Sequence, residues 1–105
     1  MKMADLLSTL FVGIDVSSRE NVVCFLDFQS QKPLASFSVP NNQPGASSMA
    51  DRIVEFMHQH KDLSFVTVAL ESTSYYGIHI ANYLSSCTLL LPFNITVYCV
   101  NPMLI

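Results

Sequence analysis

Three short apolar runs, at residues 11–16, 21–28 and 34–39, occupy the first third of the chain. Each is rich in β-branched and aromatic residues, and brief polar turns separate them, so the pattern predicts three β-strands. Connections as short as these join antiparallel neighbours. We therefore expect a three-stranded meander.

A helical period follows, because apolar residues recur at helical spacing from about Pro44 to His60. This predicts an amphipathic helix with a proline in its first turn. Residues 65–70, with the sequence FVTVAL, form a nearly continuous apolar run. Such a run is typical of a central strand covered on both faces.

The remaining third is expected to hold a second helix and a last strand. Thr73 or Ser74 can cap the helix, and the strand is predicted over residues 94–100, ending before Pro102. The buried side of this helix is predicted from the helical period to consist of Tyr76, Ile80, Tyr83 and Leu84.

The predicted element order is β-β-β-α-β-α-β. Two helical crossovers of the usual right hand produce parallel strands, so the compact arrangement is a mixed five-stranded sheet with the first strand near its centre. This is an α/β fold of the ribonuclease-H-like class, which includes nucleases, transposases and the sugar-kinase and actin ATPases. Residues 1–10 are expected to form an N-terminal extension, and residues 11–105 the domain itself.

The composition limits the possible partners. Half of the residues are hydrophobic, which is enough for a core, and the net charge is −3 with only five Lys and Arg. Since phosphate neutralisation supplies much of the affinity for nucleic acids, either nucleic acid is not a partner or its binding needs metal ions and residues outside this chain.

The cysteines and the longest apolar stretch indicate the compartment. The odd number of cysteines, three, shows no zinc or disulfide spacing, which favours a reducing, cytoplasmic setting. The N-terminus lacks a signal-peptide pattern. Residues 88–100 are interrupted by Pro92 and Asn94 and are too short to cross a bilayer, so no membrane partner is expected.

Residues 85–93, SSCTLLLPF, are long and apolar for a connection between a helix and a strand. Two interpretations stay open. The leucines could form a contact surface for self-association, or they could simply close the core.

Asp15 and Glu71 are the residues most able to carry chemistry. Alternation places Asp15 on the same face of the first strand as Phe11 and Gly13. A carboxylate inside an apolar strand is costly unless something pairs with it or binds it, and its sequence neighbours offer no counter-charge. Glu71 ends the predicted central strand, at the edge where open α/β sheets bind ligands. Each alone would favour a structural role, as a hydrogen-bonded edge residue or a cap partner. On adjacent central strands they favour a shared metal site.

Hard carboxylate oxygens suit Mg²⁺, and paired Mg²⁺ ions support phosphodiester transfer. Such a pair needs more than two protein carboxylates. The other candidates are weaker: Asp51 and Glu55 are expected on the polar side of the first helix, while His58, His60 and His79 lack metal-ligand spacing. Tyr75 and Tyr76 are more typical of packing than of nucleic-acid contact, and the serines lack a partner base.

Four segments together resemble the N-terminal domain of the DEDD transposases of the insertion-sequence-110 group and the related Piv-type invertases. They are VGIDVS at 12–17, NVVC at 21–24, LESTSYY at 70–76 and VNP at 100–102. The resemblance extends over residues 11–102. The opening segment occurs in actin-like ATPases too, so the second motif and the Asn-Pro make the match specific.

The resemblance implies that Asp15 and Glu71 are the first two acids of a four-acid, RuvC-like, Mg²⁺-dependent catalytic and metal site. It implies DNA, and in some members a structured guide RNA, as partners of the full-length protein, and no small-molecule substrate. The other two acids lie in a Thr-Asp-x-x-Asp segment after the Asn-Pro, and a C-terminal domain carries a serine. We therefore expect a truncated domain, inactive alone. Ser18 stands where the family commonly has Lys, with Arg19 next.

Two alternatives remain. A fragment of an actin-like phosphotransferase would use Asp15 near nucleotide phosphates, but residues 17–20 contain no glycine to wrap them. A non-enzymatic interaction module would use residues 85–93 as its contact surface.

Overall fold

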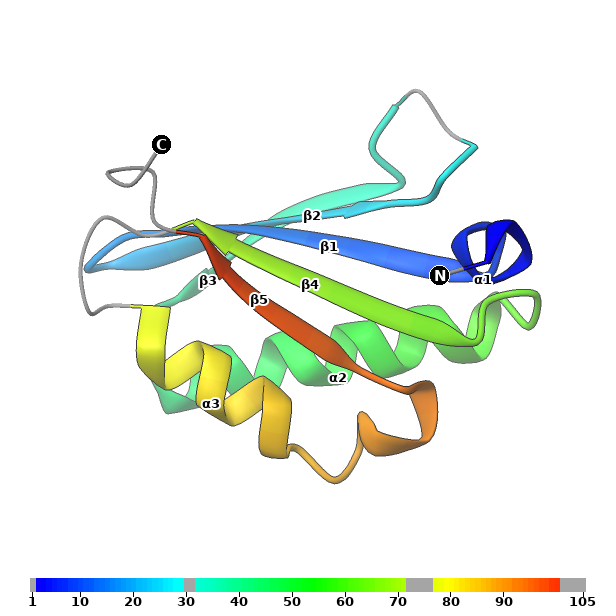
Figure 1. The fold of residues 1–105 in the computed structure, drawn as a ribbon. Helices are drawn as coiled ribbons and strands as arrows, with labels where there is room; N and C mark the ends of the chain where they lie inside the picture. Colours follow the sequence, from blue (N-terminus) through cyan, green and yellow to red (C-terminus); the bar gives the residue numbers. More distant parts are fainter. Residues whose placement is uncertain (1, 30–31, 72–76, 101–105) are drawn as a thin grey trace.

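Five strands form one mixed sheet in the order β3-β2-β1-β4-β5 (Figure 1). The computed structural model describes residues 2–29, 32–71 and 77–100. Strand β1 is antiparallel to β2 and parallel to β4, which confirms the predicted α/β ribonuclease-H-like sheet with the first strand at its centre. The elements in chain order are α1 (Met3–Leu7), β1 (Thr9–Val16), β2 (Glu20–Leu26), β3 (Ala35–Pro40), α2 (Gln43–Gln59), β4 (Phe65–Glu71), α3 (Ile78–Ser86), η2 (Leu91–Phe93) and β5 (Thr96–Val100).

Helices α2 and α3 lie on the same face of the sheet, and the opposite face is left open by the described part of the chain (Figure 1). The alternation of burial along the strands follows from this. In β4, Val66, Val68 and Leu70 are buried, whereas Thr67 is half-buried and Ala69 is exposed. The prediction that this strand is covered on both faces was wrong, because the described residues supply helices for one face only.

Helix α2 starts where its sequence provides a cap. The side chain of Asn42 accepts a hydrogen bond from the Gly45 amide at 2.8 Å, and Pro44 occupies the first turn. Met49 and Ile53 then point to the sheet at helical spacing. The predicted helix, Pro44 to His60, is confirmed within one residue at each end.

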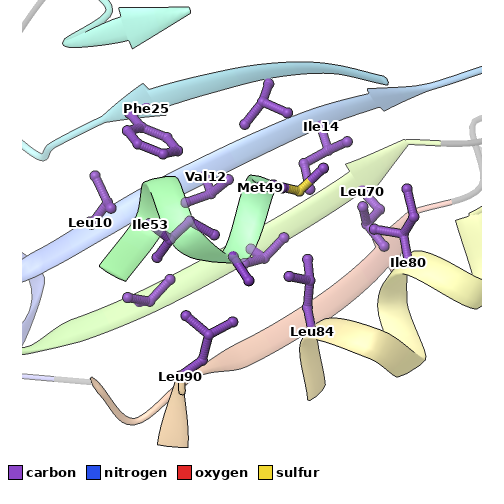
Figure 2. Packing of buried hydrophobic residues seen from close by; sticks show 14 of the residues in the cluster. Leu10, Val12, Ile14, Phe25, Met49, Ile53, Leu70, Ile80, Leu84 and Leu90 are labelled. Atoms are coloured by element: carbon purple, nitrogen blue, oxygen red, sulfur yellow. The ribbon is translucent and has the colours of Figure 1, made fainter. Parts of the chain in front are cut away.

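The core lies between α2, α3 and the sheet (Figure 2). Met49 and Ile53 of α2 lie over Val12 and Ile14 of β1, so the central strand is covered along most of its length. Helix α3 adds Ile80 and Leu84, both buried as predicted, while Tyr83 is half-buried. The predicted caps Thr73 and Ser74, and the predicted core residue Tyr76, lie outside the described residues.

Some boundaries differ from the predictions. Residues Met3–Leu7 form the short helix α1, and β1 begins at Thr9, two residues earlier than expected, because the hydroxyl of Thr9 bonds the Asp5 carbonyl and the residue is buried. Strand β5 begins two residues late, after a turn in which Asn94 adopts a left-handed conformation with φ 50°. In the part of the chain that is described, no helix has the length and apolarity needed to cross a membrane.

Candidate metal centre at the carboxyl edge of the sheet

Asp15 and Glu71 stand side by side on the two central parallel strands. They are direct Cα partners in the β1–β4 register, and neighbouring strands are about 4.8 Å apart. Both residues are exposed. Because side chains alternate along a strand and Ile14 and Leu70 point into the core, both carboxylates lie on the open face of the sheet, at the carboxyl edge that the sequence indicated.

A hollow of about 410 Å³ lies on this face beside the carboxylates. The hollow exists because the residues two positions before Asp15 and Glu71, on the same face, are small. These residues are Gly13 and Ala69, which are also partners in the β1–β4 register. A Cβ added to Gly13 would meet no atom within 4 Å. The space above Gly13 is therefore open to a ligand next to the acids.

Val22, Cys24 and Val100 contribute to the walls of the hollow. The sequence reasoning did not single them out as site residues. A signal was present for one of them, since a tight β1–β2 hairpin places Val22 opposite Asp15. Val100 lies at the site because it is the partner of Glu71 in the β4–β5 register. That register depends on the connection between α3 and β5, so local sequence patterns did not predict it.

The two carboxylates have no counter-charge among the described residues. Within residues 2–29, 32–71 and 77–100, no hydrogen bond or ion pair engages the side chain of Asp15 or Glu71. Adjacent like charges repel, and the repulsion is relieved when a cation binds between them. The local electrostatics therefore favour a divalent cation at this point.

The donor set fits Mg²⁺ in kind and is incomplete in number. Carboxylate oxygens are the ligands that Mg²⁺ prefers. Among the described residues, no cluster of three or more His, Cys, Asp and Glu side chains could hold a metal ion. Asp15 and Glu71 would thus supply part of a coordination shell, with the remaining ligands coming from elsewhere.

The other candidates lie apart from this pair. Asp51 and Glu55 are exposed on α2, as expected for a solvated helix face. His60 stacks on Phe56 and bonds its carbonyl at 2.8 Å, and His58 contacts Phe93 edge-on. His79 is exposed on α3, and the weak candidates Tyr75 and Tyr76 fall outside the described residues.

The turn after Asp15 is closed by its own hydrogen bonds. The Ser17 hydroxyl donates to the carbonyl of Glu20, and the Ser17 amide donates to the same carbonyl at 3.1 Å. The segment is a tight β-hairpin turn without glycine, which is unlike the glycine-containing loops that wrap nucleotide phosphates.

Comparison with known proteins identifies the family. A family model described as "Transposase", for the DEDD proteins of the insertion-sequence-110 group, matches residues 12–105. The chain belongs to this transposase family. The match includes both Asp15 and Glu71. No curated protein matches the chain significantly.

Solved structures similar to this transposase-family chain share its fold. RuvC of Thermus thermophilus in complex with Holliday junction substrate superposes with a TM-score of 0.56 at 16% identity, covering 90% of this chain and 66% of RuvC. Fowlpox virus resolvase, in a complex with Holliday junction DNA, gives 0.53 at 14% identity, covering 89% of this chain and 60% of the resolvase. Pelota of Archaeoglobus fulgidus superposes with a TM-score of 0.54 at 14% identity, covering 88% of this chain and 26% of Pelota. The chain thus spans less than two thirds of each.

Proposed function

We propose that this chain contributes Asp15 and Glu71 as the first two acids of a Mg²⁺ site for phosphodiester transfer in DNA transposition. The observation that carries the proposal is their pairing: direct partners on the two central strands, exposed on the open face and without a described counter-charge. Membership of the transposase family supports the reaction class.

Within such a site, each residue would have a distinct task. Asp15 and Glu71 would hold the cation, and Gly13 and Ala69 leave room beside it for a phosphodiester. Bound Mg²⁺ would supply charge stabilisation at the attacking and leaving oxygens. The apolar wall residue Val22 would limit water on one side.

DNA is the proposed substrate of the complete protein, of which residues 11–105 would be one part of the catalytic domain. The resolvases of similar fold were solved with junction DNA. A structured guide RNA, which the family resemblance implies for some members, would also be a partner of the full-length protein. Because this chain has only five Lys and Arg, most contacts to phosphates would be made by other parts of the full-length protein. We propose a cytoplasmic setting, which three cysteines without disulfide spacing favour.

Cation binding by the pair can be tested directly. Titration of the ¹⁵N-labelled chain with Mn²⁺ is expected to broaden the amide signals nearest Asp15 and Glu71 first. Asp15→Asn or Glu71→Gln is expected to weaken Mn²⁺ binding at least about tenfold, because a neutral amide loses most of the electrostatic attraction. Asp51→Asn, an exposed acid on α2, is the matched control and should leave the titration unchanged. Broadening centred on α2, or unaltered by Asp15→Asn, would refute the site.

The chain alone is expected to show no Mg²⁺-dependent strand transfer on DNA. Two carboxylates do not organise the pair of ions that phosphodiester transfer uses, and the Thr-Asp-x-x-Asp segment is not found in residues 1–105. The assay uses supercoiled plasmid and labelled oligonucleotides with the purified chain. Mg²⁺-dependent products that vanish in the Asp15→Asn variant would overturn the inactivity while retaining the site.

A further inference from the structure

The charged residues of this chain are confined to its first two thirds. All of its five Lys and Arg and its eight Asp and Glu lie within residues 1–71, and the last of them is Glu71. Helix α3, η2 and strand β5 therefore contain no Lys, Arg, Asp or Glu. Depletion of charge is a compositional mark of the central part of protein interfaces.

Strand β5 is an open edge of the sheet. Its neighbour on one side is β4, and the order β3-β2-β1-β4-β5 leaves its other side unpaired among the described residues. Edge strands are usually protected by charges, prolines or bulges. The sequence TVYCV of β5 contains none of the charges or prolines, whereas the opposite edge strand, β3, ends in Pro40.

The last part of the described chain exposes several hydrophobic side chains. Half of the ten exposed large hydrophobic residues of the described chain lie in residues 78–100: Ile78, Leu89, Leu91, Tyr98 and Val100. Tyr98 and Val100 belong to β5 itself and are the register partners of Ala69 and Glu71, so they lie on the open face of the sheet, and Tyr98 is 57% exposed. The unpaired edge strand therefore carries exposed apolar side chains.

We propose that β5 is a self-association edge, on which β5 of a second copy pairs in antiparallel orientation about a two-fold axis at Tyr98. In this register Tyr98 faces Tyr98 of the second copy, Thr96 faces Val100, and Val97 faces Cys99. The axis is perpendicular to the sheet, so the result is one continuous sheet of two chains. The helices of both copies lie on one face and both Asp15–Glu71 pairs on the other.

A second copy fits this edge better than a charged ligand does. A two-fold interface brings each surface against itself, so in this register a charge at position 98, on the axis, would meet a like charge. The uncharged β5 avoids that repulsion although the chain carries a net charge of −3. The β-branched residues Thr96, Val97 and Val100 also suit strand pairing.

The test is sedimentation equilibrium of the 105-residue chain at micromolar concentrations. The wild type is expected to dimerise, and Tyr98→Lys to raise the dimer dissociation constant at least about tenfold, because two lysines then face each other across the axis. Ser38→Lys, an exposed position on the open face of the other edge strand, is the matched control and should dimerise as the wild type does. Far-UV circular dichroism checks that both variants are folded.

A cross-link provides a second measurement that does not depend on the lysine variant. With Cys99→Ser in place, Tyr98→Cys should form an intermolecular disulfide under mild oxidation, since opposed residues in antiparallel strands are within disulfide range. Ser38→Cys in the same background should not form this disulfide.

Three outcomes would each overturn the proposal. The first is a wild-type monomer at all concentrations, the second is a dimer that Ser38→Lys dissociates and Tyr98→Lys does not, and the third is equal cross-linking by both cysteines. Capture of the edge by a different chain in preference to a second copy would overturn it as well.

Discussion

Gly45→Ala is expected to lower the free energy of unfolding by at least about 2 kcal/mol. A Cβ at this position would lie 1.8 Å from the Pro40 carbonyl oxygen and 2.8 Å from the Pro40 carbonyl carbon. Both are backbone atoms, so no side-chain rotation relieves the overlap. Alanine normally stabilises a helix by about 1 kcal/mol relative to glycine, but overpacking against fixed backbone costs about 3 kcal/mol. The unfavourable contact therefore decides the sign.

Urea unfolding followed by circular dichroism measures the effect, and Gly13→Ala is the matched control. A Cβ at Gly13 meets nothing within 4 Å, so this variant should be unchanged or more stable by up to about 1 kcal/mol. Equal stability of the two alanine variants would show that α2 does not begin against Pro40 as described.

Asn21→Val is expected to raise the free energy of unfolding by about 1–2 kcal/mol. Asn21 is completely buried between Val16 and Val39 in the strand register. Its side-chain nitrogen and oxygen find no hydrogen-bond partner in the described structure. An unsatisfied buried polar group costs about 1–3 kcal/mol, and valine removes that cost while filling similar space.

Asn41→Val is the comparison for this variant, because the Asn41 side chain donates a hydrogen bond of 2.6 Å to the Ser17 carbonyl. Loss of that bond should lower stability by about 1 kcal/mol. If Asn21→Val proved as destabilising as Asn41→Val in parallel urea titrations, Asn21 would have to be hydrogen-bonded in the native state.

The hydrophobic pattern was sufficient to predict the strands and their order. Alternation in residues 11–16 placed Val12, Ile14 and Val16 on one face of the strand and Asp15 on the other, and the structure shows that the first face is buried and that Asp15 is exposed. Short turns fixed the antiparallel pairs, and helical crossovers fixed the parallel ones. The adjacency of Asp15 and Glu71 followed from that topology.

Other features depend on tertiary context that local patterns do not contain. The FVTVAL run is equally apolar whether one face or both are covered, so the exposure of Ala69 could not be read from this run itself. The apolar residues 85–93 divide between two roles: Leu90 is fully buried, while Leu89 and Leu91 are 55% and 58% exposed. Burial of Leu90 agrees with the interpretation that the segment closes the core, whereas association through the exposed leucines stays a prediction.

The placement of Asp15 and Glu71 on different strands has a thermodynamic consequence. Strands β2 and β3 and helix α2 separate the two acids along the chain, so an unfolded chain does not hold them together. A cation that needs both carboxylates binds the native state alone, and at ten times its dissociation constant it would add about 1.4 kcal/mol to the free energy of unfolding. The thermal midpoint of the chain would then rise with divalent-cation concentration. Asp15 and Glu71 would in this way make the pairing of β1 with β4 more stable when a cation is bound.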